Sequence, residues 1–171
     1  YAADTGNSAV AMILSTSGVD LNESLIYASS AGSVNMVRLV LGFKIFPNTK
    51  DLEGWTALMH AADRGHTEVV RLLLSRGAYP NSTGPKGWTA IMLAAGRGHE
   101  DTVDLLLTSG ADPMQQDEEY WSALTWAATK GRVEVLRRLI TGGANPNERM
   151  PGGSTPLMWA ATLGHLDAVS M

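Results

Sequence analysis

A repeat of 33 residues constrains this chain more than any other feature of its sequence. The period is marked by glycines that each lie 33 residues after the one before: Gly32, Gly65, Gly98, Gly131 and Gly164. Before each of the last four, a hydroxyl residue precedes a short apolar run and an alanine pair. A fixed period of this length is typical of proteins in which one unit cannot bury its own apolar face. The sequence therefore predicts a linear stack of units.

Each period predicts two short helices joined by a turn. A hydroxyl that can accept a hydrogen bond from an exposed backbone N–H precedes each first helix, at Thr56, Thr89, Ser122 and Thr155. Pro156 then occupies a first helical position, where its missing N–H is not needed. The marker glycine ends the first helix, because helices commonly end on a residue with positive φ. A second helix with apolar residues at helical spacing follows and ends near Gly77, Gly110 and Gly143.

These motifs resemble the ankyrin repeat. The family pattern combines a Thr-Pro-Leu-His helix start, Ala-Ala, Gly-His, an apolar second helix and a Gly-Ala-Asp-x-Asn turn, and this chain follows it in six units, two of them partial. The resemblance implies an all-α, ankyrin-type solenoid of antiparallel helix pairs with short β-hairpin fingers and a concave, partner-binding face. The units expected in this single array over 1–171 are 1–22, 23–50, 51–83, 84–116, 117–149 and 150–171.

Departures from the family pattern predict local differences. Lys44 stands where Gly77 stands one repeat later, and positive φ is uncommon for lysine, so we expect that helix to end early, at Gly42. Tyr120 replaces a finger glycine, and we expect that finger tip to turn differently. Seven residues are missing before the helix start near Glu23, so we expect no finger between the first two units. The helix-start histidine of the family, which would hydrogen bond between repeats, is replaced by Met59, Met92, Thr125 and Met158.

Both ends of the chain interrupt a unit of the repeat. Residues 1–6 begin inside a first helix of the pattern, and residues 169–171 stop inside a second helix. Repeat arrays generally need terminal units with a polar outer face. We therefore expect this chain to be a fragment of a longer protein.

A tryptophan and a cation recur at the places that the family uses for recognition, the finger and the end of the first helix. The pairs in three consecutive units are Trp55 with Arg64, Trp88 with Arg97, and Trp121 with Lys130. Stacking should place them in two parallel rows on one face. Tryptophan and arginine are enriched in binding hot spots, and the combination suits a protein or extended peptide with apolar and acidic side chains. These six residues are our candidate partner-binding site.

A structural interpretation of the same residues stays open. The indoles can simply pack finger on finger, and a cation at this position complements a helix C-terminus. We expect only a weak preference for acidic ligands, because the row has acidic neighbours: Glu53, Asp63, Glu118 and Glu119. Trp126 and Trp159 lie within first helices, and we expect them to pack between repeats.

The remaining composition argues against other kinds of site. The chain has no cysteine and a net charge of −4, which excludes thiolate chemistry and disfavours nucleic acid as a partner. It has no apolar stretch long enough for membrane insertion. His66, His99 and His165 lie one or two full repeats apart rather than converging as metal ligands do, which indicates a structural role. We expect the acidic run 117–119 to be solvated. We therefore expect no catalytic, cofactor-binding or metal site.

The function that the sequence favours is a non-enzymatic module that binds a partner protein or peptide as a monomeric array. A regulatory or autoinhibitory domain of a larger enzyme or channel, acting in cis, is the alternative, and the residues do not separate the two. An independent enzyme is disfavoured because an open stack offers a groove rather than a closed pocket. The lack of cysteine suits an intracellular location, cytoplasmic or nuclear. The resemblance also raises Asn81 and Asn147 as candidates for hydroxylation.

Overall fold

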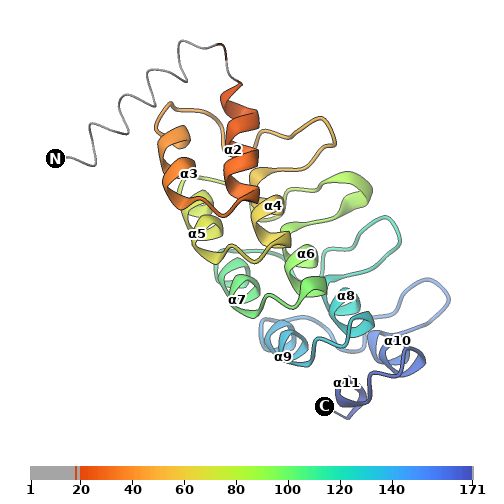
Figure 1. The fold of residues 1–171 in the computed structure, drawn as a ribbon. Helices are drawn as coiled ribbons and strands as arrows, with labels where there is room; N and C mark the ends of the chain where they lie inside the picture. Colours follow the sequence, from red (N-terminus) through yellow and green to blue (C-terminus); the bar gives the residue numbers. More distant parts are fainter. Residues whose placement is uncertain (1–17, 19, 171) are drawn as a thin grey trace.

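The fold is a stack of helix pairs (Figure 1). The structure, a computed structural model, describes residue 18 and residues 20–170. Most of the first unit, and with it the expectation that no finger separates the first two units, lies outside the described residues. The first helices of the pairs are α2 (Leu21–Ser30), α4 (Ala57–Asp63), α6 (Ala90–Arg97), α8 (Ala123–Thr129) and α10 (Pro156–Thr162). The second helices are α3 (Val34–Leu41), α5 (Thr67–Ser75), α7 (Glu100–Thr108), α9 (Val133–Thr141) and α11 (Leu166–Val169). A short 3₁₀ turn, η1, spans Pro85–Gly87.

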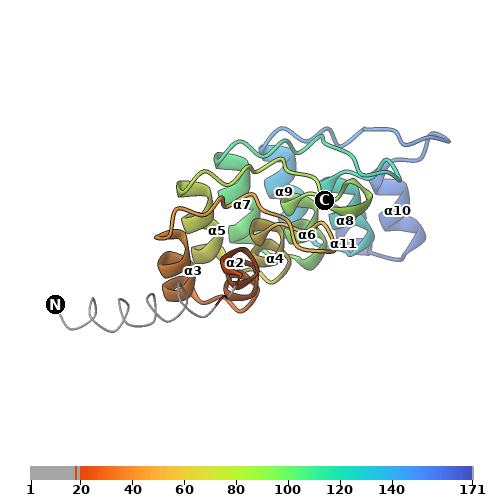
Figure 2. The same ribbon diagram turned by 90° about the horizontal axis from the view of Figure 1, so that it is seen from above.

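Like helices stack on like helices along the array. Each first helix packs on the first helix of the next pair, and the second helices form a parallel outer layer. Figures 1 and 2 show the fingers as loops that project from the side of the first helices. Within the described residues the fingers hold isolated bridges, Lys50 with Thr56 and Gln116 with Ser122, rather than strands. The predicted all-α solenoid is thus confirmed, with fingers that are turns more than hairpins.

The hydroxyl residues cap the first helices as predicted. Thr56 Oγ1 accepts from the N–H of Met59 at 3.2 Å, and Ser122 Oγ accepts from two backbone N–H groups at 3.1 and 3.2 Å. Helix α2 begins earlier than expected, at Leu21, because the carboxylate of Asp20 accepts from the N–H groups of the following residues and forms the cap there. Local side-chain chemistry therefore sets where each first helix starts.

The core runs the whole length of the described stack. The alanine pairs of α4, α6 and α8 are buried, which lets successive first helices approach closely, and buried leucines of the second helices face them. Met59 and Met92 are also buried, so apolar packing occupies the place of the family's helix-start histidine. Thr125 stands at the same position in the next unit and does make a hydrogen bond between repeats. Its hydroxyl donates to the buried carboxylate of Glu148 at 3.0 Å.

The two substituted glycine positions do not change the path of the backbone. Helix α3 ends at Leu41 with Gly42 as its cap, as predicted, yet Lys44 still adopts a φ of 58°. The expectation for Tyr120 is wrong, because its φ of 64° lies in the same region as the 89° of Gly54. The physical reason is Asp117, whose carboxylate accepts from the N–H groups of two residues at the tip, both at 2.9 Å. These hydrogen bonds offset the roughly 1–2 kcal/mol that a left-handed conformation costs a residue with a Cβ.

Candidate functional site

Two fingers are held in shape by a single aspartate each. One carboxylate oxygen of Asp51 accepts from the N–H groups of Glu53 and Trp55, at 3.0 and 2.8 Å. Its other oxygen accepts from Nε2 of His60, in α4, at 2.8 Å. Each such finger tryptophan therefore follows a fixed turn and precedes a capped helix, which defines where its indole lies.

Asp117 repeats this arrangement two units later. Its second oxygen accepts from Nε1 of Trp126, in α8, at 2.9 Å. Asp117 is buried, so the expectation that the whole acidic run is solvated is wrong for this residue, although Glu118 and Glu119 are exposed. In the last finger Met150 takes this place, and among the described residues the buried Nε1 of Trp159 has no acceptor.

Acid should weaken the finger that Asp51 organises. Burial is the largest influence on the Asp51 carboxyl group and raises its pKa. The hydrogen bonds from His60 and from the Trp55 N–H, with the charge of His60, together outweigh burial and hold the pKa below its ordinary value. Such a group stabilises the fold above its unfolded pKa, and this contribution is lost as the pH falls through its folded pKa. The free energy of unfolding should therefore decline below about pH 4.

The variant Asp51→Asn tests this acid sensitivity. It cannot ionise, so its stability should change less with pH over this range than that of the unaltered chain. Urea unfolding followed by tryptophan fluorescence from about pH 2 to pH 6 measures both profiles. Parallel profiles would show that Asp51 does not contribute to the acid dependence.

The five tryptophans form one continuous array across the fingers and first helices. Trp55 meets Trp88 edge to face with ring centroids 6.0 Å apart, and Trp88 meets Trp126 at 4.8 Å. Trp121 contacts Trp126 at 4.9 Å and Trp159 at 5.4 Å. The three finger indoles therefore do not all stack directly on one another, because Trp126 lies between Trp88 and Trp121. All five side chains are partly exposed, so the array packs the units together and also reaches the surface.

The predicted basic residues bridge to the preceding unit where that unit offers a partner. Nη1 of Arg64 donates to the hydroxyl of Ser30. Nε of Arg97 pairs with the carboxylate of Asp63 at 2.8 Å. One repeat after Ser30 and Asp63 the chain has Gly96, which has no side chain to offer. Lys130 is accordingly exposed and makes no ion pair with any residue that the structure describes.

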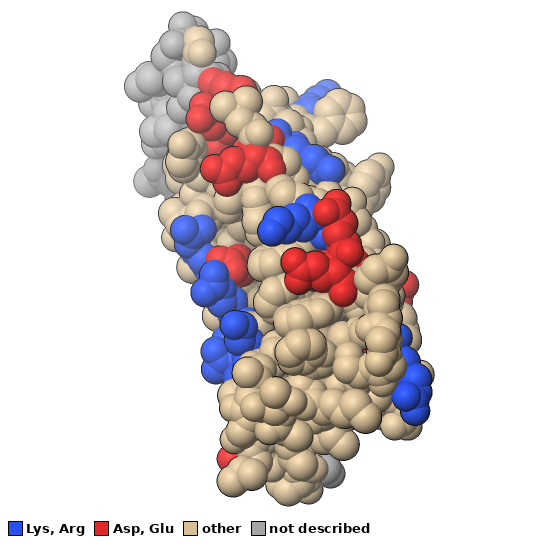
Figure 3. Space-filling model, turned by 90° about the vertical axis from the view of Figure 1, so that its right-hand side faces the viewer, with Lys and Arg blue, Asp and Glu red and all other residues tan. Residues whose placement is uncertain are grey.

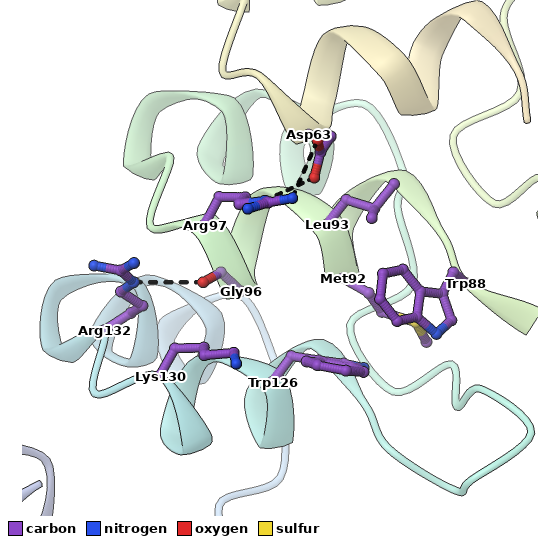
Figure 4. Close-up of a pocket in the computed structure, with 9 residues that line it drawn as sticks. All are labelled: Asp63, Trp88, Met92, Leu93, Gly96, Arg97, Trp126, Lys130 and Arg132. Atoms are coloured by element: carbon purple, nitrogen blue, oxygen red, sulfur yellow. Dashed lines mark hydrogen bonds and ion pairs between the residues drawn. The ribbon is translucent and has the colours of Figure 1, made fainter.

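A hollow of about 410 Å³ opens at this position, and we call it the Gly96 hollow (Figure 4). Its walls come from three successive first helices, one finger and the turn between α8 and α9. The lining residues are Asp63, Trp88, Met92, Leu93, Gly96, Arg97, Trp126, Lys130 and Arg132. Three of the six predicted site residues, Trp88, Arg97 and Lys130, meet here. The other three, Trp55, Arg64 and Trp121, are not among its lining residues.

Sequence reasoning missed Trp126, Arg132 and Gly96 as parts of this hollow. A signal for Trp126 exists, since it lies one helical turn into α8 and shares a unit with a finger tryptophan. Arg132 stands in the repeat position of His66, His99 and His165, and its Nε donates to the carbonyl of Gly96 at 3.4 Å. Figure 3 shows basic and acidic groups intermixed on the upper part of the finger side and a broad uncharged area below.

The repeated histidines have the structural role that their spacing predicts. Nε2 of His66, His99 and His165 donates to a carbonyl at the end of the preceding first helix, at 3.1, 3.0 and 3.0 Å. Among residues 20–170 the structure brings together no group of three or more histidine, aspartate or glutamate side chains able to hold a metal ion. The helices of the described chain are also too short or too polar to cross a membrane.

Comparison with known protein families agrees with this geometry. The family model for ankyrin repeats (3 copies) matches residues 1–84, 25–117, 74–149 and 91–171, which together cover the whole chain. The chain therefore belongs to the ankyrin repeat family, whose members are generally protein–protein interaction modules. A search of curated proteins finds no match.

Proposed function

We propose that this chain is a non-enzymatic protein-interaction module that binds its partner on the face formed by the fingers and first helices. The observation that carries the proposal is the tryptophan array, which reaches the surface of four successive units beside the Gly96 hollow. Large aromatic side chains beside cations are the residues that most often dominate binding energy at interfaces. An extended array of this kind suits an elongated partner segment rather than a small molecule.

Hydrogen exchange on an isolated complex tests which face is used. The tagged chain is used for affinity capture from a native lysate, the retained protein is purified with it, and amide protection is compared with that of the free chain. We expect added protection in the fingers and at the ends of α6 and α8. Protection confined to α5, α7 and α9 would contradict the proposed face, and failure to retain any partner protein would contradict the proposed function.

The identity of the captured ligand distinguishes the interaction module from the alternative, a regulatory domain that acts in cis. If the only ligand retained is another segment of the polypeptide to which these repeats belong, the module acts in cis. A separate protein bound in trans supports the interaction module as proposed.

A further inference from the structure

The Gly96 hollow carries positive charge that the described residues do not neutralise. Arg97 is paired with Asp63, so those two charges offset each other. Lys130 and Arg132 make no ion pair within the described chain, and Arg132 uses only Nε, in its bond to the carbonyl of Gly96. The planar Nη edge of Arg132 is therefore free to bind a carboxylate through two parallel hydrogen bonds. This excess of two positive charges stands out on a chain whose net charge is −4.

The acidic neighbours that would weaken this site lie elsewhere. Of the four acidic residues near the predicted rows, only Asp63 lines the hollow, and it is the one that Arg97 neutralises. Glu53, Glu118 and Glu119 belong to finger tips and are not among the lining residues. The sequence predicted a weak preference for acidic ligands because of these acidic neighbours. At the Gly96 hollow that reason does not apply, and a clear preference for an acidic ligand is expected.

The end of the hollow nearest the finger that carries Trp88 is apolar (Figure 4). Trp88 and Trp126 meet at an interplanar angle of 64°, and Leu93 and Met92 lie beside them. Figure 4 shows Lys130 extending from α8 alongside Trp126, with the Arg132 guanidinium further along the same side. A ligand that fills the space can therefore place a carboxylate on one side and an apolar group on the other.

The absence of a side chain at Gly96 is the reason that the space exists. In the two preceding units the equivalent positions hold Ser30 and Asp63. Each of these side chains accepts a hydrogen bond from the arginine of the next unit, Arg64 or Arg97. A Cβ at Gly96 would lie 3.9 Å from Trp126, an ordinary contact distance, so the site has room for an added group. The internal partner of Lys130 is missing, and an external carboxylate can take its place.

We propose that the Gly96 hollow binds an acidic side chain of an extended partner peptide together with an apolar side chain two residues away. This inference rests on the proposed function and specifies its partner. In an extended chain, residues two apart project to the same side, so a Glu-x-Leu or Asp-x-Leu segment presents both groups at once. The carboxylate pairs with Lys130 and Arg132, and the apolar side chain covers Trp88 and Trp126.

Peptide binding to the intact chain tests the proposal directly. The probes are three nonapeptides that differ only in the first residue of a central Glu-Ser-Leu, Gln-Ser-Leu or Lys-Ser-Leu segment, titrated against the ¹H–¹⁵N signals of the indole groups. We expect the Glu peptide to shift the signals of Trp88 and Trp126 and to bind at least about fivefold more tightly than the Gln peptide. No shift at these two indoles, or equal affinity for the Glu and Gln peptides, would overturn the proposal.

Two variants identify the groups that recognise the carboxylate. Gly96→Asp supplies an internal carboxylate for Lys130, as Asp63 does for Arg97, and should weaken the Glu peptide at least about fivefold, whereas Gly96→Ala should change its affinity less than about twofold. Lys130→Gln with Arg132→His should abolish the preference for Glu over Gln. Histidine already makes the same contact between units at His66 and His99, so the stack should be retained.

The controls distinguish failure of this inference from failure of the proposed function. Arg71→Gln with Arg76→Gln removes the same number of charges from α5 and its cap, outside the hollow, and should leave the Glu preference unchanged. A single-stranded oligonucleotide that shifts Trp88 and Trp126 more strongly than the Glu peptide at equal concentration would overturn the assignment. A captured protein partner that binds the unaltered chain and Gly96→Asp equally would remove this subsite and leave the interaction module standing.

Discussion

Replacing Gly65 with alanine should lower the free energy of unfolding by about 3 kcal/mol. Gly65 follows α4 with a φ of +69°, a conformation that costs a residue with a Cβ about 1 kcal/mol or more. A Cβ at this position would also lie 2.5 Å from Nδ1 of His99. The imidazole cannot move away without losing its hydrogen bond to the carbonyl of Asp63, so the substitution disrupts the contact between two units. Urea unfolding followed by circular dichroism measures the loss.

Gly77→Ala is the matched control for this effect. Gly77 has a φ of +89°, but no atom lies within 4 Å of the position that its Cβ would take. Its replacement should cost only the backbone term, about 1 kcal/mol. In a His99→Ala background, Gly65→Ala should also fall to about this value, because the clashing ring is gone. Equal losses for Gly65→Ala and Gly77→Ala in the unaltered chain would show that the His99 contact contributes nothing.

Replacing Asp117 with alanine should also destabilise the chain by about 3 kcal/mol. The change removes the acceptor for the N–H groups of Glu119 and Trp121 and for the indole of Trp126. It also leaves Tyr120 in a left-handed conformation without the carboxylate that holds the turn. Hydrogen bonds to a charged group contribute roughly 1.5–3 kcal/mol each, and three that share one carboxylate do not add fully. The same unfolding experiment measures it, and the indole signal of Trp126 should shift.

Glu118→Ala and Asp117→Asn separate the contributions at this finger. The side chain of Glu118 is exposed, so its removal should change stability by less than about 0.5 kcal/mol. Asparagine at 117 can still accept from the turn, but its amide nitrogen then faces the indole N–H, so an intermediate loss is expected. A loss for Asp117→Ala no larger than that for Glu118→Ala would mean that the turn is maintained by the stack alone.

Both predictions concern contacts that link a finger or helix end to its neighbours. In a stack of repeats, stability is approximately a sum of the terms within units and between adjacent units, so such contacts have effects out of proportion to their small area. The last finger provides a natural comparison, since Met150 replaces the aspartate there and the Trp159 indole has no acceptor in the described chain. The unit built around Asp117 should therefore be the better ordered of the two.

Much of the fold could be predicted because its signals are local. The hydroxyl caps, the glycines that end helices and the apolar spacing act between residues a few positions apart, and their period of 33 residues identifies the family. The errors also have a local cause. A non-glycine residue at 120 looks incompatible with the finger turn until the carboxylate of Asp117 is seen to hold it.

Only part of the candidate site could be predicted from the sequence. Trp88, Arg97 and Lys130 could be chosen from their positions in the repeat, and the structure brings them together at one hollow. Arg132 could not be chosen in this way, because the same place in the neighbouring units holds a histidine. Trp126 recurs as Trp159 one unit later, but only the stacking shows that its indole meets Trp88 of the preceding unit.

The sequence by itself determined the repeat, the helix boundaries to within a few residues, and the surface on which tryptophans and cations collect. Only the tertiary structure decided that Trp126 lies between two finger indoles, that Asp117 is buried, and that Lys130 lines the Gly96 hollow. The physical reason is distance along the chain. Caps and helix ends depend on neighbours within one turn, whereas these contacts join side chains from different units, and the geometry of stacking selects which of them meet.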